Sequence, residues 1–277
     1  MLQDLWGASL LSSAAFRENP SVRQLISFSD WEVRVKSAVV SEFILRTAKT
    51  DELVPVLVNL ARHAAQVAKA VPRYRSVFQE LLRFSNVQRI LPEAGRLEGT
   101  IRYYEGVKTI DQAGQSPLFW LQYAIGCLVG DDLKRAKFYF DTAYALAEKH
   151  NEYNTFQIDN HFARYLLVET AKTNLPVGSA VENFREARSI INRQLQRERL
   201  HYPFTVASRY QDFVDKFGAK LDPGVCREVI AAAEYVLERI SALDKEHAQH
   251  KAVRRCRESM EYVITRCGQL AERQAQP

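Results

Sequence analysis

Apolar residues recur every three or four positions along most of the chain, which is the spacing of helices with one buried face. Prolines separate many of these periodic segments. Alternating apolar and polar runs bounded by hairpin turns are absent, so the pattern predicts an all-α protein. The expected helices lie near residues 30–48, 52–70, 74–90, 93–108, 117–129, 132–149, 155–173, 178–199, 204–217, 224–242 and 245–273.

Two of the expected helices carry strong start signals. Ser116 precedes Pro117, and Asp222 precedes Pro223. A serine or aspartate side chain accepts a hydrogen bond from an unpaired N–H of the first turn, and proline at the first helical position loses no bond. These pairs therefore mark predicted helix starts.

An internal repeat runs through the chain. The second helix of a tetratricopeptide hairpin carries a small residue, then a large ring four positions on, then another small residue three positions further. Ala136, Phe140 and Ala143 match in full, as do Ala180, Phe184 and Ala187, and looser copies are Gly99, Tyr103 and Gly106, and Cys226, Ile230 and Ala233. With Ala136 as the anchor, Trp120 and Ala124 take the aromatic and small positions of the preceding helix.

These repeats predict a tetratricopeptide-like α-solenoid of stacked antiparallel helical hairpins. We group residues 1–115 as N-terminal helical hairpins, and residues 116–277 as tetratricopeptide-like repeats with a long C-terminal helix. The two parts are expected to form one continuous solenoid.

The charge balance adds little to this picture. Lys and Arg number 38 against 33 Asp and Glu, a net charge of +5, and the two signs are mixed along the chain. Local basic clusters occur at residues 193–199 and 251–257, the second with Lys251, Arg254, Arg255 and Arg257. We interpret these clusters as solvated faces of long helices, with phosphate binding as the alternative.

Motifs for catalysis or metal binding were sought and not found. No Gly-Lys dipeptide occurs, so a Walker phosphate loop is absent, and neither H-E-x-x-H nor G-x-S-x-G is present. The four cysteines form no C-x-x-C pair, and Cys256 falls on an apolar helical stripe. His247 and His250 share a helix face without a third ligand nearby in sequence. The sequence predicts no cofactor, no metal and no enzymatic activity.

Targeting signals are likewise missing from the residues given. No basic leader followed by an apolar core opens the chain, and the longest apolar stretch, residues 117–129, is too short to cross a bilayer. A cytoplasmic protein without membrane contact is expected.

One polar stripe stands out on the expected helix 155–173. Gln157, Asn160, His161 and Arg164 follow the i, i+3, i+4, i+7 spacing of a single helix face, beside several aromatic residues. Three interpretations fit: a buried hydrogen-bond network between hairpins, a groove that faces a partner, or catalysis with Asp159 and His161 as a pair. We take the four stripe residues as the candidate partner-binding site.

Several segments resemble a known family. Residues 119–124 (FWLQYA), the Gly130-Asp131 turn leading into Ala136, and residues 155–164 (TFQIDNHFAR) are similar to the C-terminal helical-repeat region of bacterial STAND-type P-loop NTPases. Residues 41–46 (SEFILR) and 82–89 (LRFSNVQR) resemble the helical segment after the NTPase core of that family. The resemblance implies a sensor region of an antiphage or signal-transduction system, although this chain lacks the NTPase itself.

The sequence therefore favours a non-enzymatic interaction or sensor module that binds a protein or peptide. The resemblance implies that a separately encoded NTPase or effector is the partner, and the apolar residues Leu2, Leu5, Trp6 and Leu10 are candidates for docking it. The alternative is a basic helical scaffold that binds nucleic acid through phosphate contacts. Salt dependence separates the two, because phosphate binding weakens steeply as salt rises.

Overall fold

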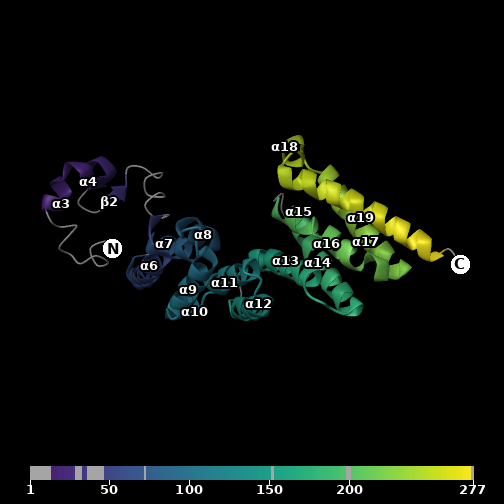
Figure 1. The fold of residues 1–277 in the computed structure, drawn as a ribbon, viewed down its shortest axis with the longest axis horizontal. Coiled ribbons are helices and arrows are strands. Elements are labelled where there is room, and N and C mark those ends of the chain that lie inside the picture. The colour runs from purple at the N-terminus through teal and green to yellow at the C-terminus, as the bar shows by residue number, and fades with distance from the viewer. Residues whose placement is uncertain are drawn as a thin grey trace. The chain divides into compact units, whose positions relative to one another are not determined.

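A computed structural model describes residues 14–28, 33–35, 47–71, 73–150, 153–197 and 201–275 (Figure 1). The chain forms two compact units, Met1–His150 and Asn151–Pro277. The described residues are almost entirely helical, which confirms the predicted all-α class. No helix among them is long and apolar enough to cross a membrane.

The first unit begins with short elements. Helices α3 (Ala14–Glu18) and α4 (Pro20–Leu25) precede an antiparallel pair of strands, β1 (Ile26–Phe28) and β2 (Val33–Val35). The predicted helix 30–48 is wrong at residues 33–35, because three residues are too few to distinguish alternation from helical spacing. Residues 36–46 of that prediction, and the apolar residues at positions 2–10, lie outside the described residues.

Seven further helices follow among the described residues of the first unit: α6 (Thr50–Ala70), α7 (Arg73–Leu82), α8 (Phe84–Ile90), α9 (Arg96–Lys108), α10 (Asp111–Gly114), α11 (Pro117–Val129) and α12 (Leu133–Glu148). Helix α6 packs against α7 and α9, and α11 packs against α12 across a three-residue turn at residues 130–132. The single helix predicted over 74–90 is divided at Arg83, whose backbone is extended.

Helix α9 approaches α6 closely through its glycines. A Cβ atom at Gly106 would lie 2.7 Å from Cγ2 of Val58, and one at Gly99 would lie 2.5 Å from Cγ2 of Thr50. Between them, the hydroxyl of the buried Tyr103 donates to the carbonyl of Leu81 at 2.7 Å. The small-ring-small pattern at residues 99–106 therefore lies at a tight helix–helix contact.

The centre of the first unit is the apolar helix α11. Its side chains are buried on nearly every side, as the sequence indicated. The ring of Tyr123 stacks on Tyr104 of α9 at 5.1 Å and on Tyr139 of α12 at 4.2 Å. Gln122, the polar residue inside this helix, accepts a hydrogen bond from the backbone N–H of Phe84 at 2.8 Å. Ala136, Phe140 and Ala143 of α12 are fully buried.

In the second unit, residues 153–197 and 201–275 form seven α-helices and one 3-10 helix: α13 (Phe156–Lys172), α14 (Val177–Arg197), α15 (Tyr202–Ala207), α16 (Tyr210–Phe217), η1 (Gly218–Lys220), α17 (Pro223–Ser241), α18 (Lys245–Ala248) and α19 (Lys251–Ala275). Helix α13 pairs with α14, and α17 pairs with α19. Helices α15 and α16 contact both α14 and α19.

Two predicted helices of the second unit are interrupted. The helix predicted over 204–217 is interrupted after Ala207. There the Ser208 hydroxyl donates a hydrogen bond to the carbonyl of Thr205, and such side-chain bonds compete with regular helical bonding. The helix predicted over 245–273 breaks before Lys251, where Nδ1 of His250 accepts from the N–H of Ala252 at 3.3 Å. At both breaks a side chain bonds to the local backbone.

The repeat positions of the second unit divide into two groups. Ala180, Phe184 and Ala187 are buried, and the Phe184 ring stacks on Phe213 of α16 at 4.7 Å. In the fourth copy Cys226 and Ala233 are buried, but Ile230 at the ring position is partly exposed. The ring position of that copy is therefore not a core position. The neighbouring Val229 is fully buried.

The four cysteines are buried free thiols. Burial raises the pKa of Cys127, Cys256 and Cys267 to about 12. Cys256 is fully buried on α19, as its apolar stripe predicted. These thiols pack as small apolar groups.

The boundary between the compact units lies after His150, whereas the sequence grouped the chain after residue 115. The difference follows from α11, which packs against α7, α8 and α9 as well as against α12. The hairpin of α11 and α12 therefore belongs with the N-terminal helices. The continuous solenoid stays a prediction.

Candidate functional site

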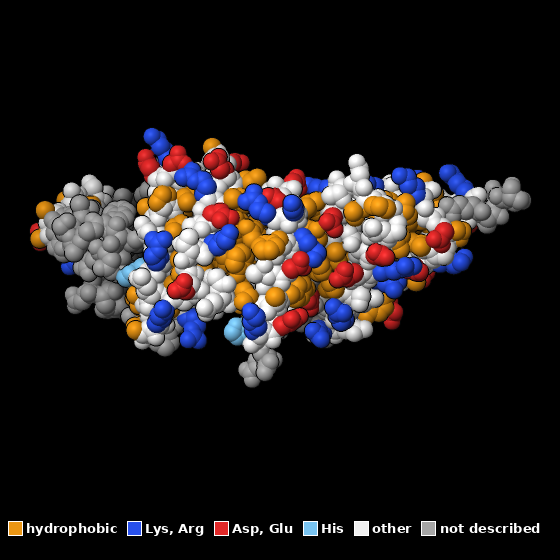
Figure 2. Space-filling view, turned by 90° about the horizontal axis from the view of Figure 1, so that it is seen from below, with side chains coloured by type: hydrophobic (Ala, Val, Ile, Leu, Met, Phe, Trp, Pro, Cys, Tyr) orange, Lys and Arg blue, Asp and Glu red, His pale blue; other side chains and the backbone are white. Residues whose placement is uncertain are grey.

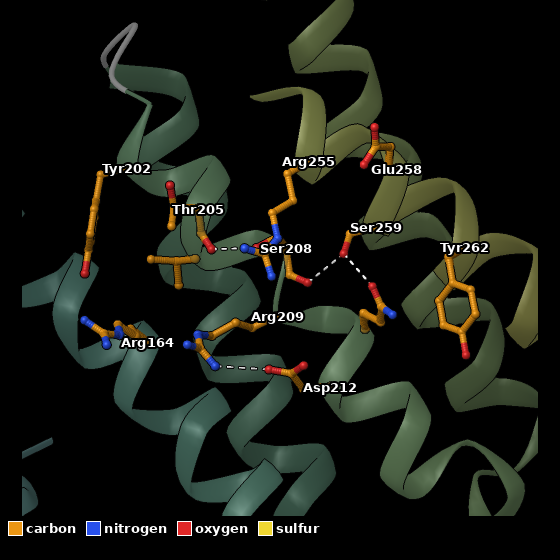
Figure 3. A pocket seen from close by; sticks show the side chains of 12 residues that line it. Arg164, Tyr202, Thr205, Ser208, Arg209, Asp212, Arg255, Glu258, Ser259 and Tyr262 are labelled. Atoms are coloured by element: carbon orange, nitrogen blue, oxygen red, sulfur yellow. Dashed lines mark hydrogen bonds and ion pairs between the residues drawn. The ribbon is translucent and has the colours of Figure 1, made fainter. Parts of the chain in front are cut away.

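The second unit contains a cavity of about 620 Å³, lined by residues of α13, α15, α16 and α19 and of the turn between α15 and α16 (Figure 3). Arg164 comes from α13, Arg209 from the turn that starts α16, and Arg255 from α19. The break between α15 and α16 places Ser208 and Arg209 at the wall of this pocket.

The charges in the pocket are unequally paired. Arg209 forms an ion pair with Asp212 at 3.1 Å. Within the described part of the chain, neither Arg164 nor Arg255 has a carboxylate at ion-pair distance, and Glu258 has no basic partner. The charges of these three side chains are therefore not neutralised by an ion pair among the described residues, although the Arg164 guanidinium also hydrogen-bonds the Tyr202 hydroxyl.

Hydrogen bonds tie the helices around the pocket together. The hydroxyl of the buried Ser259 on α19 lies 2.9 Å from both the carbonyl oxygen of Ser208 and Oε1 of Gln211. On the same helix, the Tyr262 hydroxyl donates to Asp215 at 2.5 Å. This bond raises the pKa of Tyr262, so the phenol is a neutral donor near neutral pH. The pocket thus has a wall whose position is fixed by bonds between α16 and α19.

The predicted polar stripe divides between surface, interior and pocket. Gln157 is exposed, and Asn160 is 2% exposed with no hydrogen-bond partner for Oδ1 among the described residues. His161 is half-buried outside the pocket lining, and Arg164 lines the pocket. Partner binding by these four residues stays a prediction, and Arg164 is the member that the structure places at a cavity.

His161 supports the pocket wall indirectly. Its Nδ1 lies 2.8 Å from the hydroxyl of Tyr202, a lining residue, and the two rings are 4.8 Å apart. Burial, reinforced by the charge of Arg164, lowers the pKa of His161 to about 3. The ring is therefore neutral near pH 7, and its Nδ1 can accept a hydrogen bond from the Tyr202 hydroxyl. Burial also raises the pKa of Tyr202, against the opposing charge of Arg164.

Asp159 and His161 do not form a pair. Oδ2 of Asp159 accepts from Nε2 of Gln194 at 3.1 Å and from the Thr155 hydroxyl at 3.2 Å. The aspartate thus belongs to a buried polar contact between α13 and α14, while His161 contacts Tyr202. Because Asp159 lies off the stripe, an internal hydrogen-bond network of the four stripe residues stays a prediction.

The sequence did not single out most of the pocket. Tyr202, Arg209 and Tyr262 carried no motif, and their juxtaposition depends on how α15 and α16 pack between α13 and α19. Arg255 did carry a signal, since it belongs to the basic cluster at residues 251–257. That cluster is solvated as interpreted, with Arg255 exposed at the pocket.

A third histidine joins the pair noted in the sequence. The ring of His201 stacks on that of His250 with centroids 3.6 Å apart and an interplanar angle of 5°. The ring centroid of His247 lies 5.4 Å from that of His201. Stacked rings do not aim their nitrogens at one point, and within the described ranges no group of three His, Cys, Asp or Glu side chains fits a metal ion. Burial and the two neighbouring histidines lower the pKa of His201.

Comparisons of the chain with protein-family models, with curated proteins and with solved structures found no match.

Proposed function

We propose that this chain is a non-enzymatic interaction module that binds a protein or peptide partner at the pocket of the second unit. The observation that carries the proposal is a cavity of about 620 Å³ whose lining includes two arginines, Arg164 and Arg255, without carboxylate partners in the described part of the chain. Ligand sites are concave and use a few polar groups to fix orientation. One of these arginines belongs to the stripe that the sequence singled out.

A tetratricopeptide-like arrangement of hairpins fits this role. In support, the small-ring-small residues of α12 and α14 are buried, and each of these helices pairs with the helix before it. Repeat proteins use the surfaces between stacked hairpins to bind extended segments of other proteins. We carry the predicted solenoid forward as part of the proposal.

The resemblance to STAND-type NTPases supplies a setting for the partner. We propose that the chain acts as the sensor part of a defence or signalling system, and that a separately encoded NTPase or effector responds to it. The support is the set of similar segments, in particular residues 119–124 and 155–164, together with the missing phosphate loop. A cytoplasmic location belongs to the same proposal.

Surface charge favours a protein partner over nucleic acid. On the face shown in Figure 2, basic and acidic side chains are intermixed instead of separated into one positive surface. Phosphate binders usually concentrate their positive charge along a face or groove. Nucleic-acid binding is therefore an outcome to be tested and not a second proposal.

An affinity capture with matched variants tests the proposed function. The tagged chain, Arg255→Gln and the control Arg254→Gln would each be used as bait in extracts of the source cells, with and without nuclease treatment. Both arginines are exposed on α19, but only Arg255 lines the pocket, and surface substitutions change stability by less than about 0.5 kcal/mol.

We expect a polypeptide that is retained by the wild type and by Arg254→Gln, lost with Arg255→Gln, and insensitive to nuclease. Equal loss with both variants, or loss on nuclease treatment, would contradict the pocket as a protein site. A steep fall of binding with salt would point to phosphate contacts instead.

A further inference from the structure

We infer that the pocket of the second unit recognises a carboxylate of an acidic peptide segment. The inference rests on the proposed function and specifies its ligand. It starts from Arg164, Arg209 and Arg255, which line one cavity although they come from three different parts of the chain (Figure 3). Guanidinium groups offer paired N–H donors that match the two oxygens of a carboxylate.

The three arginines are not equivalent. Arg209 is already paired with Asp212 at 3.1 Å, so its charge is largely matched within the chain. Arg164 and Arg255 have no such carboxylate partner among the described residues. The charges of Arg164 and Arg255 are therefore the ones available to an anion that enters the cavity.

The charge of the lining indicates which anion fits. Three arginines and two carboxylates, Asp212 and Glu258, give a formal charge of +1 (3 − 2). A carboxylate carries one negative charge and neutralises that excess. A phosphate monoester carries close to two negative charges near pH 7 and would leave the lining with an uncompensated negative charge. The composition of the lining therefore favours a carboxylate over a phosphate.

The remaining lining suits a peptide. Tyr202 and Tyr262 contribute aromatic rings against which a peptide can pack, and the hydroxyl groups of Thr205 and Ser208 already bond to carbonyls of the chain. A volume of about 620 Å³ is within the range of small-ligand sites and exceeds what a free carboxylate needs. A Glu or Asp side chain and a chain terminus present the same carboxylate, so the test must distinguish these two sources.

The test is an NMR titration of the full chain that follows the arginine Nε–Hε signals, assigned with Arg→Lys variants. The probes are N-acetyl-glutamate amide for a side-chain carboxylate, N-acetyl-alanine for a terminal carboxylate, N-acetyl-glutamine amide as the neutral isostere, and inorganic phosphate. We expect saturable shifts of Arg164 and Arg255 with one or both carboxylates at about millimolar affinity. The tighter of the two identifies the source.

Four variants sharpen the result. Arg255→Gln should weaken carboxylate binding by about tenfold or more, since it removes a charge-assisted hydrogen bond, while its neighbour Arg254→Gln should not. Glu258→Gln should tighten binding several-fold, because it removes a like charge from the lining, whereas Glu261→Gln, exposed on the same helix outside the lining, should leave it unchanged.

The inference is overturned if the neutral amide shifts the same signals equally, if phosphate binds more tightly than both carboxylates, or if no pocket arginine responds up to about 50 mM probe. These outcomes are distinct from failure of the proposed function. A partner whose capture still depends on Arg255 would keep the pocket as a protein site and reject only the carboxylate as its ligand.

Discussion

Two phenylalanines two positions apart on α12 have opposite environments. Phe140, the ring position of a full repeat match, is fully buried, whereas Phe138 is 63% exposed. Phe140→Ala should lower the free energy of unfolding by about 3–5 kcal/mol, because it removes a core ring and leaves a cavity. Phe138→Ala, the matched control, should change it by less than about 0.5 kcal/mol. Urea denaturation of both variants measures the difference, and equal effects would show that the repeat register is wrong.

His161 makes the stability of the second unit depend on pH. Burial lowers its folded pKa to about 3, below the value of about 6.5 in an unfolded chain. Between these values the unfolded chain binds a proton that the folded chain does not, so the stabilisation is complete above about pH 6.5 and declines as the pH falls toward 3. The loss from His161 between pH 6.5 and 5 should be about 1–2 kcal/mol.

His161→Asn removes the titrating group and keeps a polar atom near Tyr202, so its unfolding free energy should fall less over the same pH range. Urea denaturation at several pH values measures how steeply the unfolding free energy of the wild type and of the variant changes with pH. A variant with the wild-type slope would mean that the acid sensitivity of the unit comes from other groups.

At the scale of elements, Lys216 stabilises the carboxyl end of α13. Its Nζ donates to the carbonyls of Thr170 at 3.1 Å, Ala171 at 2.9 Å and Thr173 at 2.5 Å. The last carbonyls of a helix lack partners within the helix and carry partial negative charge, so a cation there is favourable. This contact joins α16 to the carboxyl end of α13.

Lys216→Met keeps much of the side-chain length and removes the donor. It should cost about 1–3 kcal/mol, because three partly buried carbonyls lose their partner. The exposed Lys220 provides the control, and Lys220→Met should be close to neutral. Thermal unfolding compares the stability of the two variants. If Lys216→Met is as stable as the wild type, water replaces the ammonium group without loss of stability.

Sequence reasoning placed helices best where a capping signal and a long periodic run coincide. Helix α11 spans Pro117–Val129 as predicted, with the Ser116 side chain accepting from the N–H of Phe119. It failed where local side-chain bonding interrupts a periodic run, as at Ser208 and His250, or where elements are three residues long, as at β2. Apolar periodicity indicates which face of a helix is buried, but it does not indicate where a side chain competes for backbone hydrogen bonds.

At the scale of the whole molecule, the pocket shows what a single helix face cannot reveal. The stripe on α13 led to Arg164, but Asn160 of the same stripe is interior and Gln157 is on the surface. Arg209 and Arg255 reach the same cavity because α15 and α16 pack between α13 and α19. Packing between helices that are distant in the sequence determines which polar residues line the same cavity. The spacing of residues along one helix cannot predict it.

The most direct measurement of the central claim is photo-crosslinking from inside the pocket in living cells. The photoreactive residue p-benzoylphenylalanine would replace Thr205, which is exposed and lines the cavity, or Glu261, which is exposed on α19 outside it. The pocket account predicts a discrete polypeptide adduct from position 205 that is absent from position 261. Equal adducts from both positions, an adduct with nucleic acid, or no adduct from position 205 would contradict a protein-binding pocket in the second unit.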